Sequence, residues 1–132
     1  MKKAILLIFL FGLSNQMFSE VTKAKTTSVA VSEKLDNGEW EEWGEWEDLS
    51  VLIVLNGDDD RLKIFSKAKS IFDIVLWKDQ TTNSNGDQIT LCKAVDEDGI
   101  EVIIKFVVIK DFDNQLYIYY NNFRIVYSYY IL

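Results

Sequence analysis

The sequence contains no histidine, no proline and a single cysteine among its 132 residues. Without histidine it lacks the commonest general base and the commonest transition-metal ligand, so a Ser or Cys catalytic triad would have no base. Without proline, its turns must be built from glycine, asparagine and aspartate. The lone Cys92 cannot form an internal disulfide, and we interpret it as a small buried hydrophobe in a strand.

Positive charge is also scarce, because 14 Lys and Arg residues face 21 Asp and Glu residues, for a net charge of −7. A chain this negative repels phosphate backbones, so we expect no nucleic-acid partner. Charged side chains such as Asp73, Lys93 and Glu101 also interrupt the apolar stretches. We therefore expect no stable insertion into a membrane.

The first nineteen residues have the layout of a secretory signal peptide. Lys2 and Lys3 form a basic start, residues 4–13 are an uninterrupted apolar run, and Ser19 is a small residue at the expected cleavage site. The run is too short to cross the roughly 30 Å hydrocarbon core of a bilayer. We predict that residues 1–19 are removed and that the protein is exported, to the periplasm or the cell exterior if the source is bacterial. The processed chain would then lose two cations and carry a net charge of −9.

The remaining chain predicts an all-β domain, since no segment shows a sustained helical apolar period. Residues 20–37 are polar and are expected to form a flexible lead-in, with a short strand at 29–31 as an open alternative. Residues 38–132 are expected to form a single β domain. Strands recur about every 8–12 residues, which is typical of an antiparallel meander of about seven or eight strands in a small sandwich or barrel. The expected strands are Ser50–Leu55, Arg61–Ser66, Ile71–Trp77, Gln88–Val95, Ile100–Ile109, Gln115–Tyr120 and Phe123–Tyr130.

Three tryptophans spaced three residues apart, Trp40, Trp43 and Trp46, are the most unusual local feature. On a regular strand, Trp40 and Trp46 would share one face, although a bulge at residue 44 would change that phase. Exposed aromatic rings stack on sugar rings, and Glu42 and Glu45 lie beside them to accept hydroxyl protons. These five residues are therefore the candidate site for a glycan or protein ligand. The alternative is that two tryptophans fill the core and the third covers a sheet edge.

Seven acidic residues crowd the same stretch, which suggests a second kind of binding protein. Such a segment could dock on a cationic partner, so a small acidic inhibitor of a basic exported enzyme is an alternative function. It could also simply protect a sheet edge from unwanted pairing. The seven are Asp36, Glu39, Glu41, Glu42, Glu45, Glu47 and Asp48.

Catalysis is not expected, and no catalytic residue is assigned. Two carboxylates could in principle run glycoside hydrolysis, but no acidic pair stands in an apolar setting in the sequence. Acidic turns at 58–60, 96–98 and 111–113 offer oxygen ligands, yet none has the twelve-residue spacing of a calcium loop. We therefore predict no metal and no cofactor, and a carboxylate-dependent hydrolase remains the least favoured function.

Two further patterns bear on the fold. Gly38-x-Trp40, together with Arg124 near the end of the chain, resembles the Gly-x-Trp and late Arg arrangement of lipocalin-like barrels. The resemblance implies a barrel in which a tryptophan near the first strand packs under a cation from the last strand, although this chain is shorter and lacks the usual disulfide. Six tyrosines near the C-terminus form either a binding surface or cross-strand pairs. They are Tyr117, Tyr119, Tyr120, Tyr127, Tyr129 and Tyr130.

Overall fold

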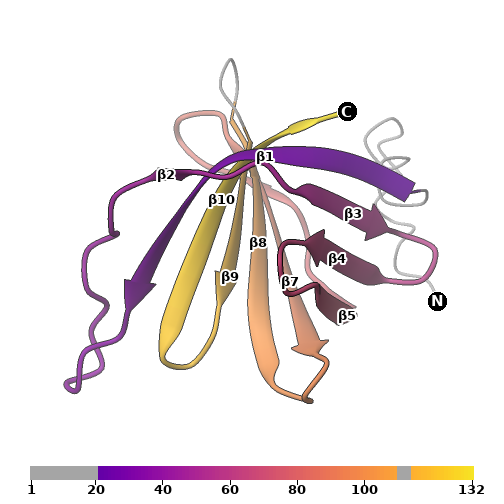
Figure 1. The fold of residues 1–132 in the computed structure, drawn as a ribbon. Coiled ribbons are helices and arrows are strands. Elements are labelled where there is room, and N and C mark those ends of the chain that lie inside the picture. The colour runs from indigo at the N-terminus through magenta and orange to yellow at the C-terminus, as the bar shows by residue number, and fades with distance from the viewer. Residues whose placement is uncertain (1–20, 110–113) are drawn as a thin grey trace.

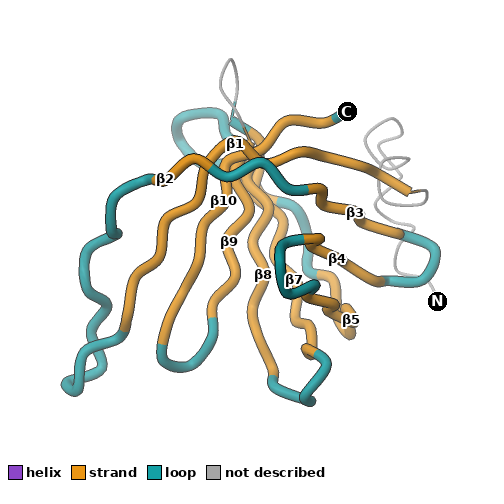
Figure 2. Tube along the Cα trace, in the orientation of Figure 1, coloured by secondary structure: helices purple, strands orange, loops and turns teal. Residues whose placement is uncertain are grey.

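The computed structural model describes residues 21–109 and 114–132, and in these ranges the chain is strands, turns and loops throughout (Figure 2). The predicted all-β fold is thus confirmed, while the predicted signal peptide lies outside the described residues. The described ranges hold no helix that is long and apolar enough to span a bilayer. The strands are β1 (Val21–Glu33), β2 (Glu47–Asp48), β3 (Leu52–Asn56), β4 (Arg61–Phe65), β5 (Ser70–Trp77), β6 (Thr81–Thr82), β7 (Gln88–Asp96), β8 (Glu101–Val108), β9 (Asn114–Tyr119) and β10 (Phe123–Ile131).

The strands form a closed antiparallel barrel rather than a sandwich (Figure 1). From β3 to β10 each long strand pairs with the next along the chain, in the order β3-β4-β5-β7-β8-β9-β10. β1 pairs with β3 on one side and with β10 on the other, which closes a ring of eight strands. The two-residue strands β2 and β6 are additions that pair with β1 and β7.

The seven strands expected from residue 50 onward all exist, with bounds that differ by one or two residues. The turns between them also follow the sequence. At the β7–β8 hairpin, Gly99 adopts a φ of 82°, which only glycine adopts without strain, and its N–H donates to Asp96 O at 3.0 Å. The alternation of apolar and polar residues and the turn chemistry therefore agree in this part of the chain.

The expectation of a flexible lead-in over 20–37 is wrong for residues 21–33, which form β1, the longest strand. β1 pairs with β10 from Ala24↔Ile131 to Glu33↔Phe123 and so completes the barrel. Its buried residues are all small or polar, namely Ala24, Thr26, Ala30 and Ser32, and so it lacks a conspicuous apolar face. The barrel begins before the Asn37-Gly38 turn, not after it.

A bulge between Thr26 and Ser28 reverses which alternate side chains of β1 point into the barrel. Before the bulge, Ala24 and Thr26 point inward; after it, Ala30 and Ser32 point outward because they pair with the outward residues of β10. Thr26 is buried, and its Oγ1 accepts a hydrogen bond from Val51 N–H at 2.9 Å and donates to Leu49 O at 2.6 Å. This hydroxyl satisfies backbone groups that the distorted ladder leaves unpaired.

The interior is filled by inward side chains from all eight barrel strands. Its fully buried members include Leu62, Phe72, Ile104, Leu116 and Ile118. Cys92 lies among them at 1% exposure and is a free thiol, as the sequence predicted. Burial raises the pKa of the Cys92 thiol well above its usual range, so the group stays protonated and unreactive.

Candidate functional site

The tryptophan segment is not a regular strand. Residues 41–46 run antiparallel to the second half of β1 but form only scattered backbone hydrogen bonds with it. Glu41 N–H donates to Glu33 O at 2.8 Å, and Gly44 N–H donates to Val31 O at 2.9 Å. From one of these hydrogen bonds to the next, the segment moves on by three residues, whereas β1 moves on by two. One extra residue on one of two paired chains defines a β-bulge.

Glycine is favoured at position 44 of this bulge because the two backbones approach closely there. A Cβ added at Gly44 would lie 3.1 Å from the backbone oxygen of Val31. The extra residue changes the phase of the segment, as expected for a bulge at residue 44, so the alternation of a regular strand does not apply. Trp40 and Trp43, which a strand would place on opposite faces, both pack on the outer face of the barrel.

Arg124, near the start of β10, lies against both of these indole rings. Its guanidinium carbon is 4.9 Å from the ring centroid of Trp40 and 4.2 Å from that of Trp43. Its Nη2 donates a hydrogen bond to Glu41 O at 3.1 Å, while its buried Nε has no partner among the described residues. The contact of a tryptophan with a cation from the last strand, implied by the resemblance to lipocalin-like barrels, is therefore present.

Two tyrosines of β9 extend the same arrangement. Tyr117 and Tyr119 alternate with buried Leu116 and Ile118, so they point outward, and their rings stack at 6.0 Å with an angle of 5°. Trp43 packs on Tyr117 with ring centroids 5.8 Å apart, and Trp40 packs on Tyr119 at 6.4 Å. The rings of the two segments thus form one continuous layer.

Lysine side chains complete this layer. Lys105 Nζ of β8 lies 4.3 Å from the ring centroid of Tyr117, and Lys34 Nζ lies 4.9 Å from that of Trp40. Within the described ranges, these cations and Arg124 form no ion pair, and the one salt bridge joins Arg61 to Asp73. We call this group the aromatic–cation cluster; its members are Lys34, Trp40, Trp43, Lys105, Tyr117, Tyr119 and Arg124.

A small second core lies beneath the cluster, outside the barrel interior. Ala30, Ser32 and Val126 point outward, yet they are 2%, 4% and 1% exposed. Ser32 Oγ donates to Glu41 O at 2.7 Å, which holds the segment on β1. The idea that two tryptophans plug the barrel core is wrong, because Trp40 and Trp43 are half-buried on this outer face.

Trp46, Glu42 and Glu45 differ from Trp40 and Trp43 in being exposed. Trp46 is 48% exposed and packs on no other ring among the described residues. Glu42 borders a shallow hollow together with Glu33, Glu41 and the backbone of Gly44. The five candidate residues therefore divide into two fixed rings, one accessible ring and two solvent-facing carboxylates on one stretch of chain.

The tyrosines do not form the expected cross-strand ladder between the last two strands. Tyr117 lies opposite Val126, and Tyr127 lies opposite Leu116. Tyr127 points inward, whereas Tyr117 points outward into the cluster. Partial burial raises the pKa of Tyr117, and the neighbouring Tyr119 raises it further, although Arg124 acts in the opposite direction.

Comparison of the chain with protein-family models, curated proteins and solved structures gives no match. Tyr117 and Tyr119 belong to the site and are among the C-terminal tyrosines that the sequence offered as a binding surface, whereas Lys105 also belongs to the site but did not stand out in the sequence. The outward positions of β8 and β9 are recognisable from the alternation, but only the three-dimensional register brings them beside the tryptophan segment.

Proposed function

We propose that the protein is a non-catalytic binding domain whose outer aromatic face receives a glycan. The observation that carries the proposal is the exposed Trp46 ring on the same chain segment as the fixed rings of Trp40 and Trp43. An indole that is 48% exposed and stacks on no other ring among the described residues leaves a large apolar surface in water, where a sugar ring could stack. The export of the domain, on which its access to extracellular glycans depends, remains a prediction from residues 1–19.

Electrostatics and shape also favour a hydroxyl-rich ligand. The hollow beside the tryptophan segment is open and is bordered by the carboxylates of Glu33, Glu41 and Glu42. Carboxylates accept hydrogen bonds from sugar hydroxyls without requiring a deep, dry pocket. The cluster around Arg124 holds the neighbouring rings in place before the ligand arrives, which reduces the entropy lost on binding.

Titration with soluble oligosaccharides tests this proposal. We expect cellohexaose, xylohexaose, laminarihexaose or chitohexaose to change the tryptophan emission of the protein in a saturable manner. The variant Trp46→Ala should weaken that binding at least tenfold, whereas Phe65→Ala, which removes an aromatic residue 39% exposed elsewhere, should not. Failure of all four sugars to bind, or equal binding by Trp46→Ala, would overturn the proposal.

The exposed acidic segment favours a second candidate, a protein that docks on a cationic partner. All seven acids between residues 36 and 48 are exposed, so the segment presents a concentrated negative surface.

Binding to the cationic probe lysozyme should then weaken steeply between 20 mM and 500 mM salt, because screening shortens the reach of exposed charges. Glu42→Gln combined with Glu45→Gln should weaken this binding more than Glu97→Gln combined with Asp98→Asn. Salt-insensitive binding would count against this candidate. A carboxylate-dependent hydrolase is not proposed further.

A further inference from the structure

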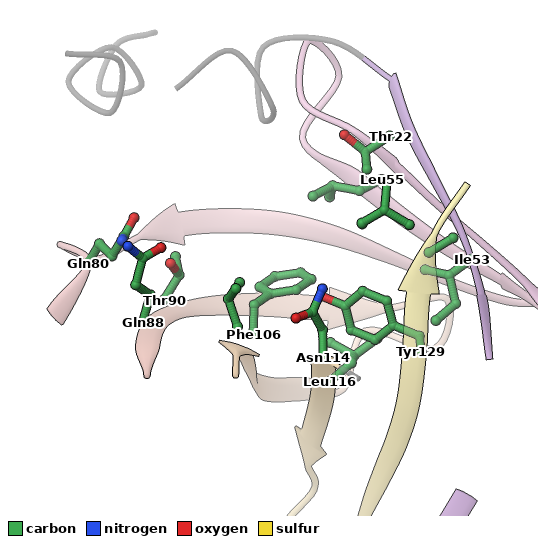
Figure 3. A pocket seen from close by; sticks show the side chains of 13 residues that line it. Thr22, Ile53, Leu55, Gln80, Gln88, Thr90, Phe106, Asn114, Leu116 and Tyr129 are labelled. Atoms are coloured by element: carbon green, nitrogen blue, oxygen red, sulfur yellow. The ribbon is translucent and has the colours of Figure 1, made fainter. Parts of the chain in front are cut away.

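A cavity of about 70 Å³ lies inside one end of the barrel (Figure 3), whereas the aromatic–cation cluster lies on the outer face. We call this end the mouth: β1 begins there, and β3, β8 and β10 end there. The floor of the cavity includes the buried side chains of Ala24, Phe106 and Leu116. Below them the barrel is filled, so the cavity is a blind pocket and not a channel.

The cavity wall is apolar with a few uncharged polar groups. Of the thirteen described residues that line it, none is charged. Its polar groups are amides and hydroxyls, including those of Gln88, Thr90, Asn114 and Tyr129. Burial raises the pKa of Tyr129 to about 12, so this phenol stays neutral at physiological pH. A buried charge on a ligand would therefore have no counter-ion in the wall.

Exposed apolar side chains gather round the mouth. Val21, Val108, Ile131 and Leu132 lie at this end and are between 40% and 66% exposed. Val108 and Ile131 also line the cavity, so apolar surface continues from the rim into the interior. Such an apolar entrance, with a few polar groups to orient the ligand, is typical of small-molecule sites.

The size of the cavity limits what can enter it. A cavity of roughly 150 Å³ lined by apolar residues is large enough to hold benzene. At about 70 Å³, the mouth cavity has half that space. The enclosed part therefore fits the end of an unbranched hydrocarbon chain and excludes a ring system, while the polar atom of such a ligand would remain near the rim amides.

We propose that the barrel mouth is a second binding site, which takes the end of a linear alkyl or acyl chain carrying an uncharged polar head group. This site is independent of the proposed glycan face. The side-chain amides of Gln80, Gln88 and Asn114 form no hydrogen bond with another described residue and can donate to or accept from the head group. The neutral wall selects an amide or alcohol over a carboxylate or an ammonium group.

Methyl NMR of the purified protein, titrated with octanamide and with octanoate at pH 8, tests this inference. Octanamide should shift the methyl resonances of Leu55, Leu116 and Ile131, which line the cavity, and leave that of Ile103 on the outer face unchanged. Octanoate, which is anionic at this pH, should bind at least tenfold more weakly. Absence of any shift with octanamide would overturn the site, and equal binding of the two would overturn the uncharged head group.

Two cavity-filling variants provide the structural control. Ala24→Leu fills the pocket from its floor and should weaken octanamide binding at least tenfold. Ala68→Leu makes the same change in an exposed turn and should bind as the natural protein does. If Ala24→Leu fails to fold, Thr90→Leu fills the pocket from its half-buried wall. Undiminished binding in a folded cavity-filling variant would contradict the proposed location.

Discussion

Arg124 is the residue on which the outer face most depends. It contacts two indole rings and the backbone oxygen of Glu41, and thereby joins β10 to a segment that lies outside the barrel. A guanidinium over an indole is attracted by the negative face of the ring, and partial burial strengthens the attraction to about 2 kcal/mol. The planar group also stacks in a way that an ammonium cannot.

Replacing this arginine should therefore destabilise the protein measurably. For Arg124→Met we expect the free energy of unfolding in urea to fall by about 1–3 kcal/mol, from the lost cation–π contacts and the lost hydrogen bond. Arg124→Lys should recover part of that loss. The matched variant Arg61→Met, which breaks an exposed ion pair with Asp73, should lower the free energy of unfolding by less than Arg124→Met does, because water screens exposed ion pairs. A loss in Arg124→Met no larger than that in Arg61→Met would contradict the importance of the cluster.

The buried thiol of Cys92 and the buried phenol of Tyr129 predict how the stability of the protein depends on pH. Burial raises the pKa values of Cys92 and Tyr129, so the unfolded chain loses these protons at a lower pH than the folded chain does. The folded state then binds more protons, and the free energy of unfolding falls as pH rises. The fall should begin near the ordinary thiol pKa of about 8.5 and steepen above about 10, where free tyrosine ionises.

The thiol contribution can be isolated by substitution. Cys92→Ala should flatten the decline between about pH 8.5 and 10, where each such group contributes at most about 1.4 kcal/mol per pH unit. Urea unfolding at a series of pH values measures both curves. Parallel curves for Cys92→Ala and the natural protein would show that the thiol does not have the raised pKa described above.

Among the elements, β1 explains best what the sequence could and could not reveal. From residue 50 onward, strands such as β8 carry large apolar residues at alternate positions between clear turn residues, so local pattern alone predicts them. β1 instead has alanine and threonine at its inward positions before the bulge, and the bulge reverses the alternation midway. Its strand character comes from pairing with β3 and β10, which are distant in sequence, and local reasoning cannot detect such pairing.

The bulge makes Thr26 the most sensitive position of this strand. Its hydroxyl serves two backbone groups, Val51 N–H and Leu49 C=O, in a place that is 1% exposed. Thr26→Val keeps the shape but leaves both groups unsatisfied, so we expect a loss of about 2–4 kcal/mol in the free energy of unfolding. Thr26→Ser retains the hydroxyl and should cost less than Thr26→Val. If Thr26→Ser is the more damaging variant, the methyl contact and not the hydrogen bonds holds the bulge.

For the whole molecule, closure of the barrel separates two surfaces with different chemistry. The pairing of β1 with β10 brings the tryptophan segment beside β9 and β10, although about 75 residues separate Trp43 from Tyr117 in the chain. The tryptophans and the acids were recognisable in the sequence as candidates. The contact of Tyr119 with these tryptophans, the place of Lys105 in the cluster and the cavity at the mouth depend on barrel register and could not be predicted from local pattern.

The most direct test of binding at the outer face is the indole N–H spectrum of the protein during an oligosaccharide titration. The chain has four tryptophans, and Trp77 is an internal reference because it packs against the core and its Nε1 donates to Asp60 at 2.9 Å. On addition of the hexasaccharide that binds best, we expect the resonances of Trp46 and Trp43 to move while that of Trp77 stays in place. Movement of Trp77 alone, or of no indole resonance with any of the four sugars, would contradict glycan binding at this face.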